Sequence, residues 1–151
     1  MFWIRRALVL CLGVLWAGPV CAFTFSYGNL LEVKDVQNKN GTLMLPITKR
    51  KYNNVKVLAK KVYSFLEQCK KDCRYETAGK KFEIAQFRLA SSREDMLIVQ
   101  VDIQQEIRLT FLVFKGKKTP FIKAPNEVVF KDKKWEAAIY QQLKELAEKE
   151  L

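Results

Sequence analysis

The sequence predicts an α+β domain: an antiparallel sheet, made of a hairpin and a three-stranded meander, with two amphipathic helices packed on one face. Apolar residues alternate with period two in several short segments, as in half-buried strands, and recur with helical spacing in two longer ones. The chain has 151 residues, of which 49% are apolar and 28% charged, a composition typical of one globular domain. We therefore expect residues 23–151 to form a single basic α+β domain.

Residues 1–22 have the layout of a cleaved signal peptide. Two arginines precede an apolar run that ends at Pro19, a helix breaker. The run is shorter than the roughly 20 apolar residues that a membrane-spanning helix requires. The small side chain of Ala22 favours cleavage between Ala22 and Phe23. We therefore expect the mature chain to be periplasmic or secreted.

Two alternatives to simple cleavage concern the same leader. It could remain uncleaved as an N-terminal anchor, or Cys21 could carry a lipid. Pro19 and Val20 stand directly before this cysteine, where a bacterial lipobox has small residues, and this argues against lipidation. The cleaved signal peptide is the interpretation that we favour.

Cleavage would leave Cys69 and Cys73 as the two cysteines of the mature chain. An even number of cysteines in an exported chain predicts a disulfide. A loop of about five residues gives a stabilisation of roughly 2 kcal/mol, so its role would be to fix the end of the preceding helix. The alternatives are free thiols or a redox-active pair, because Lys70 and Lys71 would lower the pKa of a thiol. Two cysteines without any histidine do not complete a zinc site, and we expect no metal and no cofactor.

The first hairpin is predicted from its turn. The runs Leu30–Val36 and Thr42–Ile47 flank an Asn-Gly pair, a strong signal for a tight turn between strands. Asn40 also begins an N-glycosylation sequon, but this short motif uses the residues that turns favour. We expect two strands joined by this turn.

A helix is predicted from Asn53 to about Cys69. Apolar residues recur there at helical spacing and form one stripe: Val55, Leu58, Val62, Phe65, Leu66 and Cys69. A stripe of this kind is typical of a face buried in the core, so we assign it no ligand-binding role.

Three further strands are predicted by parity, because antiparallel partners share one face of a sheet. Apolar residues occupy odd positions, which pairs 89 with 97, 87 with 99 and 85 with 101, and then 103 with 107, 101 with 109 and 99 with 111. The second turn, Gln104-Gln105-Glu106, lacks the glycine usual in a three-residue loop. One long bent strand over residues 96–114 is therefore the alternative to a meander.

The C-terminal segment is predicted to hold a short strand and a helix. A proline-punctuated connector, Pro120–Pro125, precedes a strand at Glu127–Phe130. Asp132 can then cap a helix whose apolar residues stand at helical spacing: Trp135, Ala138, Ile139, Leu143, Leu146 and Ala147.

The sequence contains few of the residues and motifs that are typical of a catalytic site. Histidine, the commonest general acid and base near neutral pH, is absent. The sequence contains no nucleophile elbow, P-loop or dinucleotide-binding glycine pattern. The carboxylates of Glu83, Asp102 and Glu106 lie on or beside expected strands, but nothing marks them as a facing pair, and we expect them on solvated faces. We do not expect an enzyme.

An excess of positive charge is the most distinctive feature of the composition. The sequence has 27 Lys plus Arg against 16 Asp plus Glu, and its net charge is +11. Three clusters are candidate anion-binding sites: Lys49, Arg50 and Lys51; Lys115, Lys117 and Lys118; and Lys131, Lys133 and Lys134. They would attract anionic lipid, acidic glycan or nucleic acid. The mature basic set is mostly lysine, whereas shaped recognition of phosphate or base edges prefers arginine, so we expect no specific nucleic-acid recognition. The alternative without a binding role is that these lysines keep the protein soluble and protect sheet edges from pairing with other chains.

These observations favour an exported, non-catalytic binding or assembly module that acts through its sheet face or its basic turns. Its partner would be a protein of the envelope or the extracellular space, with anionic lipid or glycan as further candidates. The first alternative is a factor directed by charge to anionic lipid, acidic glycan or nucleic acid. The second is a thiol oxidoreductase that uses Cys69 and Cys73.

Overall fold

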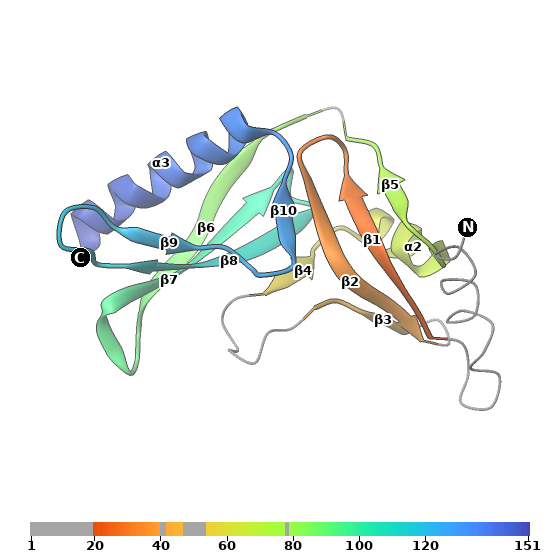
Figure 1. The fold of residues 1–151 in the computed structure, drawn as a ribbon, viewed down its shortest axis with the longest axis horizontal. Coiled ribbons are helices and arrows are strands. Elements are labelled where there is room, and N and C mark those ends of the chain that lie inside the picture. The colour runs from red at the N-terminus through yellow and green to blue at the C-terminus, as the bar shows by residue number, and fades with distance from the viewer. Residues whose placement is uncertain (1–19, 40–41, 47–53, 78) are drawn as a thin grey trace, which may run out of the picture.

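Two β-sheets and two helices make up the part of the chain that the structure, a computed structural model, describes: residues 20–39, 42–46, 54–77 and 79–151 (Figure 1). In chain order the elements are β1 (Val20–Tyr27), β2 (Leu31–Lys39), β3 (Thr42–Met44), β4 (Val55–Val57), α2 (Lys60–Gln68), β5 (Cys73–Tyr75), β6 (Phe82–Ala90), β7 (Arg93–Ile103), β8 (Ile107–Phe114), β9 (Phe121–Lys123), β10 (Val128–Phe130) and α3 (Lys133–Glu150). The α+β class is confirmed, with strand predominating.

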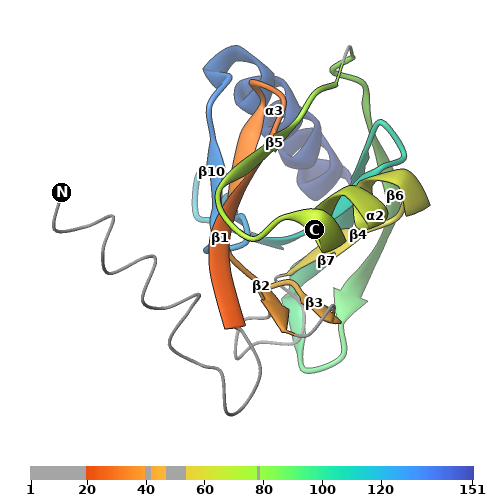
Figure 2. The same ribbon diagram turned by 90° about the vertical axis from the view of Figure 1, so that its right-hand side faces the viewer.

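The strands form two sheets that share one apolar core. The first sheet has the order β10-β2-β1-β5, with β3 also paired to β2, and it is mixed because β5 runs parallel to β1. The second sheet is antiparallel, with the order β4-β8-β7-β6 and with β9 also paired to β8. Figures 1 and 2 show the first sheet on one side of the molecule and β6–β8 on the other. The expected single antiparallel sheet is therefore wrong.

The division into two sheets was not foreseen, because the strand that extends the first sheet beyond the predicted hairpin, β1, begins in the leader. Phe23, Phe25 and Tyr27 alternate along β1 and are almost completely buried. This period-two pattern is a strand signal at the start of the expected mature chain. β5 has only three residues, too few to show a period. It is positioned by its pairing with β1, which is a tertiary contact that no local pattern announces.

The two helices contact different strands. α3 packs on β8 and β9, whereas α2 contacts β3 of the first sheet and β4 of the second. Figure 1 shows them at opposite ends of the molecule. The prediction that both helices pack on one face of a single sheet is therefore wrong. Neither helix in the described ranges carries an apolar stretch that could cross a bilayer.

The predicted cleavage site falls inside β1. Residues 20–22 pair with residues 37–39 of β2, and Phe23 pairs with Val36. Removal of residues 1–22 would shorten β1 at this end. The part that begins at Phe23 would keep its partners on both sides, β2 and β5.

The first predicted hairpin is confirmed. β2 and β3 pair antiparallel, with Gln37 opposite Met44 and Lys39 opposite Thr42. The turn residues Asn40 and Gly41 lie outside the described residues, as does Ile47. Leu43 and Leu45 pack against the core while Met44 is exposed, which is the alternation of a half-buried strand.

The predicted helix over residues 53–69 is too long at its start. Residues 55–57 form β4, which pairs with residues 107–109 of β8, and α2 begins only at Lys60. The backbone N–H groups of Leu58 and Ala59 donate to the carbonyl oxygen of Glu106, which holds this segment against the β7–β8 turn. Pairing with an edge of the sheet has overridden the helical spacing of Val55, and valine fits a strand better than a helix.

The three-stranded meander is confirmed in nearly every pair. Residues 103 with 107, 101 with 109 and 99 with 111 pair as expected, and so do 89 with 97 and 87 with 99. The expected pair of Ala85 with Val101 is wrong, because a bulge between Ile84 and Gln86 shifts the register and places Ile84 opposite Val101. The glycine-free turn exists, with Gln104 and Gln105 both in the left-handed region at φ 55°.

The C-terminal elements match the expected order, with one addition. Residues 121–123, inside the expected connector, form β9 against β8. β10 and α3 follow as predicted. The carboxylate of Asp132 accepts a hydrogen bond from the backbone N–H of Trp135 at 3.1 Å, which confirms the predicted N-cap.

Candidate functional site

The outer face of the second sheet, turned away from the core, carries the main candidate site. Gln100 and Thr110 are direct neighbours across β7 and β8, and Gln86 of β6 pairs with Gln100. Their row continues with Asn54, whose backbone carbonyl accepts from the Thr110 N–H at 2.9 Å. Because successive strand residues alternate between faces, this polar row lies on the side opposite the apolar residues Val99 and Leu109.

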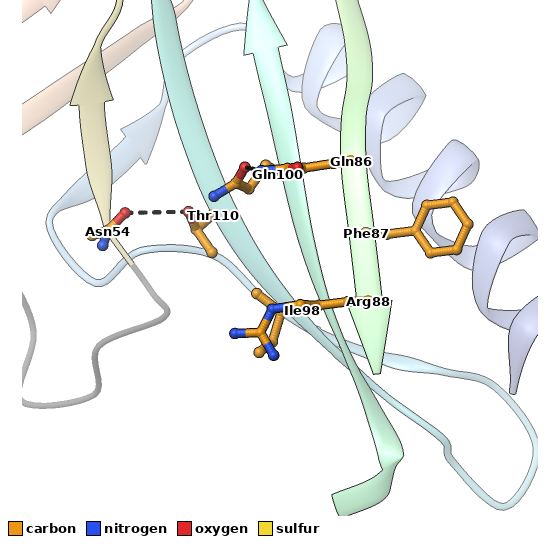
Figure 3. A pocket seen from close by; sticks show the side chains of 7 residues that line it. All are labelled: Asn54, Gln86, Phe87, Arg88, Ile98, Gln100 and Thr110. Carbon is orange, nitrogen blue, oxygen red and sulfur yellow. Dashed lines mark hydrogen bonds between the residues drawn. The ribbon is translucent and has the colours of Figure 1, made fainter. Parts of the chain in front are cut away.

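A hollow of about 400 Å³ lies over this row, lined by Asn54, Gln86, Phe87, Arg88, Ile98, Gln100 and Thr110. Figure 3 shows Asn54 and Thr110 on one side of it and the residues of β6 on the other. The side chain of Phe87 points to the other face of the sheet, toward α3. The side chain of Ile98 is buried and supplies an apolar patch, while Arg88 supplies a cation on β6.

The polar side chains of the hollow hold one another in place. The Gln86 amide nitrogen donates to the Gln100 amide oxygen, and the Thr110 hydroxyl donates to the Asn54 amide oxygen at 3.2 Å (Figure 3). Each primary amide has two N–H donors and an oxygen with two lone pairs. The bond between Gln86 and Gln100 uses one N–H of the first amide and one lone pair of the second, so the two glutamine amides keep further hydrogen-bonding capacity for a ligand.

An ion pair stands beside this row. Asp102 and Arg108 lie opposite each other on β7 and β8 and form two hydrogen bonds, at 2.6 and 2.9 Å. The hydrogen bonds to Asp102 raise the pKa of Arg108, with burial opposing. Asp102 lies on the outer face but is buried, so the expectation that it is solvated is wrong. Its carboxylate is occupied by a fixed partner, and its role is to hold two strands together.

Glu106 forms a second buried polar cluster, between the sheets. Its carboxylate accepts hydrogen bonds from the hydroxyl of Tyr27 on β1 and from that of Tyr75 on β5, the latter at 3.1 Å. The ammonium group of Lys61 on α2 lies 3.2 Å from it. Both carboxylate oxygens are thus occupied, and the expectation of a solvated face is wrong here too. Of the three carboxylates considered from the sequence, Glu83 is the exposed one.

Burial and this carboxylate shift the pKa values of its partners. The pKa of Tyr27 is raised strongly, first by burial and then by its hydrogen bond to Glu106. The pKa of Tyr75 is raised for the same two reasons, whereas that of Lys61 is raised mainly by its hydrogen bond to Glu106. The raised pKa values extend to higher pH the range in which the two phenols donate to Glu106. The cluster joins β1, β5, α2 and the β7–β8 turn, which is a structural role.

The Cys69 and Cys73 sulfur atoms lie at disulfide distance, with Cα atoms 6.3 Å apart. α2 ends at Gln68 and Cys69 is already extended, which confirms that the chain leaves the helix where the sulfurs meet. The side-chain amide of Asn38 on β2 donates to the Glu67 carbonyl at 2.7 Å and thereby caps the end of α2. The pair therefore links the end of α2 to the first residue of β5.

Replacing both cysteines with serine is expected to lower the free energy of unfolding by about 2 kcal/mol, because the short loop then gains freedom in the unfolded chain. Urea unfolding of the Cys69→Ser/Cys73→Ser variant and of the wild-type protein measures this difference. Reduced wild-type protein is the control and should match the variant. Equal stability of all three, together with rapid thiol exchange by the wild type, would support the oxidoreductase alternative instead.

The basic clusters are not gathered into one surface in the described ranges. Lys49, Arg50 and Lys51 lie outside the described residues. The cluster at residues 115–118 stands on the β8–β9 turn, beside the C-terminal end of α3 (Figure 1). Residues 131–134 stand at its other end, and a helix of 18 residues is about 27 Å long.

Two of these C-terminal lysines already have partners. Lys131 forms an ion pair with Glu32 at 2.7 Å, and Lys133 with Glu136 at 3.6 Å. Both lysines are exposed, so the pairs are weak, but they reduce the net field of this cluster. A combined anion site made from residues 115–118 and 131–134 is therefore not favoured by the geometry.

Comparison with protein-family models, with curated proteins and with solved structures found no match. Over residues 20–39, 42–46, 54–77 and 79–151, no group of three acidic or sulfur side chains is arranged to hold a metal ion. The hollow was missed at the sequence level. Its residues had one visible signal, which is that Gln100 and Thr110 stand between apolar positions of two strands.

Proposed function

We propose that the protein is an exported, non-catalytic binding module and that the outer face of its second sheet is the binding surface. The observation that carries the proposal is the hollow lined by Asn54, Gln86, Gln100 and Thr110. Binding sites commonly combine a concave shape with a few placed polar groups. Here the polar groups stand on β6, β7 and β8, which are rigid supports, with Asn54 beside β4.

The chemistry of the lining favours an acidic carbohydrate as the ligand. Amide and hydroxyl side chains both donate and accept, which matches the hydroxyl groups of a sugar. Ile98 makes part of the lining apolar but is almost fully buried, so polar contacts dominate, and Arg88 on β6 places positive charge at the hollow, which favours an acidic ligand. The net positive charge, +11 for the whole sequence and, at 25 − 16, +9 without Arg5 and Arg6 of the leader, would raise the local concentration of such an anion.

Export is supported by the leader and by the cysteine pair. The leader has the order of a signal peptide, with two arginines, an apolar run and a proline. Cys69 and Cys73 lie at disulfide distance, and disulfides persist in oxidising compartments such as the periplasm or the extracellular space. The absence of histidine from the sequence and the mutual pairing of Asp102 with Arg108 support a binding role over catalysis.

Titration of the isotope-labelled protein with an oligogalacturonate, a short chain of uronic acids, tests the proposal by nuclear magnetic resonance. The shifted amide signals are expected to cluster at Gln86, Gln100 and Thr110. Gln100→Ala is expected to weaken binding about fivefold, because one neutral hydrogen bond contributes about 1 kcal/mol. A neutral maltooligosaccharide should bind more weakly than the acidic one.

The matched control is Gln142→Ala, which removes an exposed amide from α3 and should leave binding unchanged. No binding of the uronic acid chain, or equal loss of affinity in both variants, would contradict the proposal. Signals confined to the lysines of the β8–β9 turn, lost at physiological salt, would instead support the factor directed by charge.

A further inference from the structure

β6 is a long strand at an edge of the second sheet. It has nine residues and pairs with β7 on one side, and no strand of the described ranges pairs with its other side. An edge of this length offers a row of backbone donors and acceptors to another strand. Natural proteins commonly shorten, charge, bulge or cover such an edge. β6 carries two charged residues, Glu83 and Arg88, and a bulge between Ile84 and Gln86, but it is long and uncovered on this side.

Apolar side chains are exposed along this edge. Phe87 is 42% and Leu89 49% exposed. They pair with Val99 and Leu97, which belong to the core. Both therefore lie on the inner face of the sheet, at its edge, where the core does not cover them. Two large apolar residues on the same face of an edge strand are typical of an interaction surface.

The bulge in β6 gives its two faces an unusual order. Glu83 pairs with Asp102 and Gln86 with Gln100, so these two residues lie on the outer face although their numbers differ by three. Ile84 and Phe87 pair with core residues and lie on the inner face. The halves of β6 on either side of the bulge are thus out of phase by one residue.

This order makes β6 complementary to itself. In an antiparallel pair of two copies, Glu83 lies opposite Arg88 of the partner subunit when Ile84 lies opposite Phe87 of the partner subunit. Each of these pairs shares a face of the sheet, as antiparallel pairing requires. Opposite charges then meet on the outer face and apolar groups on the inner face, and the two-fold symmetry repeats each pair.

We propose that the protein forms a symmetric dimer in which β6 pairs antiparallel with β6 of a second copy, in the register that places Glu83 opposite Arg88 of the partner subunit. The two second sheets become one continuous sheet. Phe87 and Leu89 are covered by the partner's β6, next to Ile84 and Phe82 of the partner subunit. The inference goes beyond the proposed binding function and does not depend on it, but it gives Arg88 a second contact, with Glu83 of the partner subunit, at the rim of the hollow. It also brings the two hollows side by side on one face, because Gln86 lies near the symmetry axis.

Charge reversal tests the register. Sedimentation velocity of the full exported chain over a wide range of concentration is expected to show a monomer–dimer equilibrium. Glu83→Arg and Arg88→Glu each place like charges opposite each other twice per dimer, and each is expected to raise the dissociation constant at least about tenfold. The double variant Glu83→Arg/Arg88→Glu exchanges the charges and is expected to restore the dimer. Mixing the two single variants is expected to give heterodimers, since one edge is then wholly positive and the other wholly negative.

The matched control is Glu148→Arg, which makes the same reversal at an exposed position of α3 and should leave the dimer intact. Thermal unfolding confirms that each variant is folded. A wild-type protein that stays monomeric at all concentrations would overturn the proposal, and so would a dimer that the single reversals leave unchanged. A double variant that fails to restore the dimer would overturn the assigned register. Loss of oligogalacturonate binding in Gln100→Ala with an unchanged dimer separates this result from the proposed function.

Discussion

Replacing Glu106 with alanine is expected to lower the free energy of unfolding by about 3 kcal/mol, because it leaves buried donors without an acceptor. The Glu106 side chain is 10% exposed and accepts from Tyr27 and Tyr75. Tyr27 is fully buried, so water cannot replace the lost acceptor. Lys61 contributes less, since its side chain is 70% exposed and its ion pair is largely solvated. Equilibrium unfolding in urea measures the change.

A double-mutant cycle with Tyr27→Phe separates this hydrogen bond from the rest. The phenylalanine variant removes the buried hydroxyl together with its need for a partner, so Glu106→Ala in that background is expected to cost clearly less. Lys61→Ala is the control on the exposed side of the cluster and should cost well under 1 kcal/mol. Equal costs of Glu106→Ala in both backgrounds would contradict the interaction.

The same cluster predicts a loss of stability in alkali. The folded-state pKa of Tyr27 is raised above the ordinary value of 10.0, by burial and then by Glu106. The folded state therefore keeps a proton that the unfolded chain loses. This contribution to stability is complete below pH 10 and declines as the pH rises toward the raised value. Tyr27→Phe should show a shallower decline in the free energy of unfolding above pH 10.

Phe111→Ala is expected to cost about 4 kcal/mol, the largest loss among the variants considered. Phe111 on β8 is fully buried. Its ring stacks on Phe130 of β10, with 6.4 Å between ring centroids, and meets the ring of Tyr140 of α3 edge-on, with 6.1 Å between centroids. Its ring thus joins the second sheet to the first sheet and to α3. Truncation removes these contacts and leaves a cavity where three elements meet.

Phe121→Ala is the matched control for this variant. Phe121 lies on β9 of the same sheet but is 62% exposed, so its truncation should cost less than about 1 kcal/mol. Urea unfolding measures the free energy of unfolding of each variant, and the two should depend on urea concentration with the same slope. Equal costs would mean that the shared core does not depend on the ring at position 111.

Elements with a long period could be predicted from the sequence. The meander followed from the parity of its apolar residues, and the start of α3 followed from the side chain of Asp132. β4, β5 and β9 could not be predicted in the same way, because each has three residues inside a segment with another local pattern and is defined by its partner strand. β3 and β10 have the same length, but the Asn-Gly turn before β3 and the apolar run after Pro125 mark them.

The candidate site was harder to predict than the fold. The positions of Gln100 and Thr110 between apolar residues indicate an outward face, but the hollow also needs Asn54 beside β8 and the bulge that turns Gln86 outward. The burial of Glu106 likewise depends on β1 and β5, which the sequence did not reveal. Both features arise where segments distant in the chain meet.

The pairing of β10 with β2 joins late residues to early ones. A polypeptide that emerges from its N-terminus, whether from a ribosome or from a translocation channel, lacks this outer strand until almost all of it has appeared. The first sheet therefore reaches its full width only after most of the chain has been made. Completion of the shared core is delayed until late in synthesis.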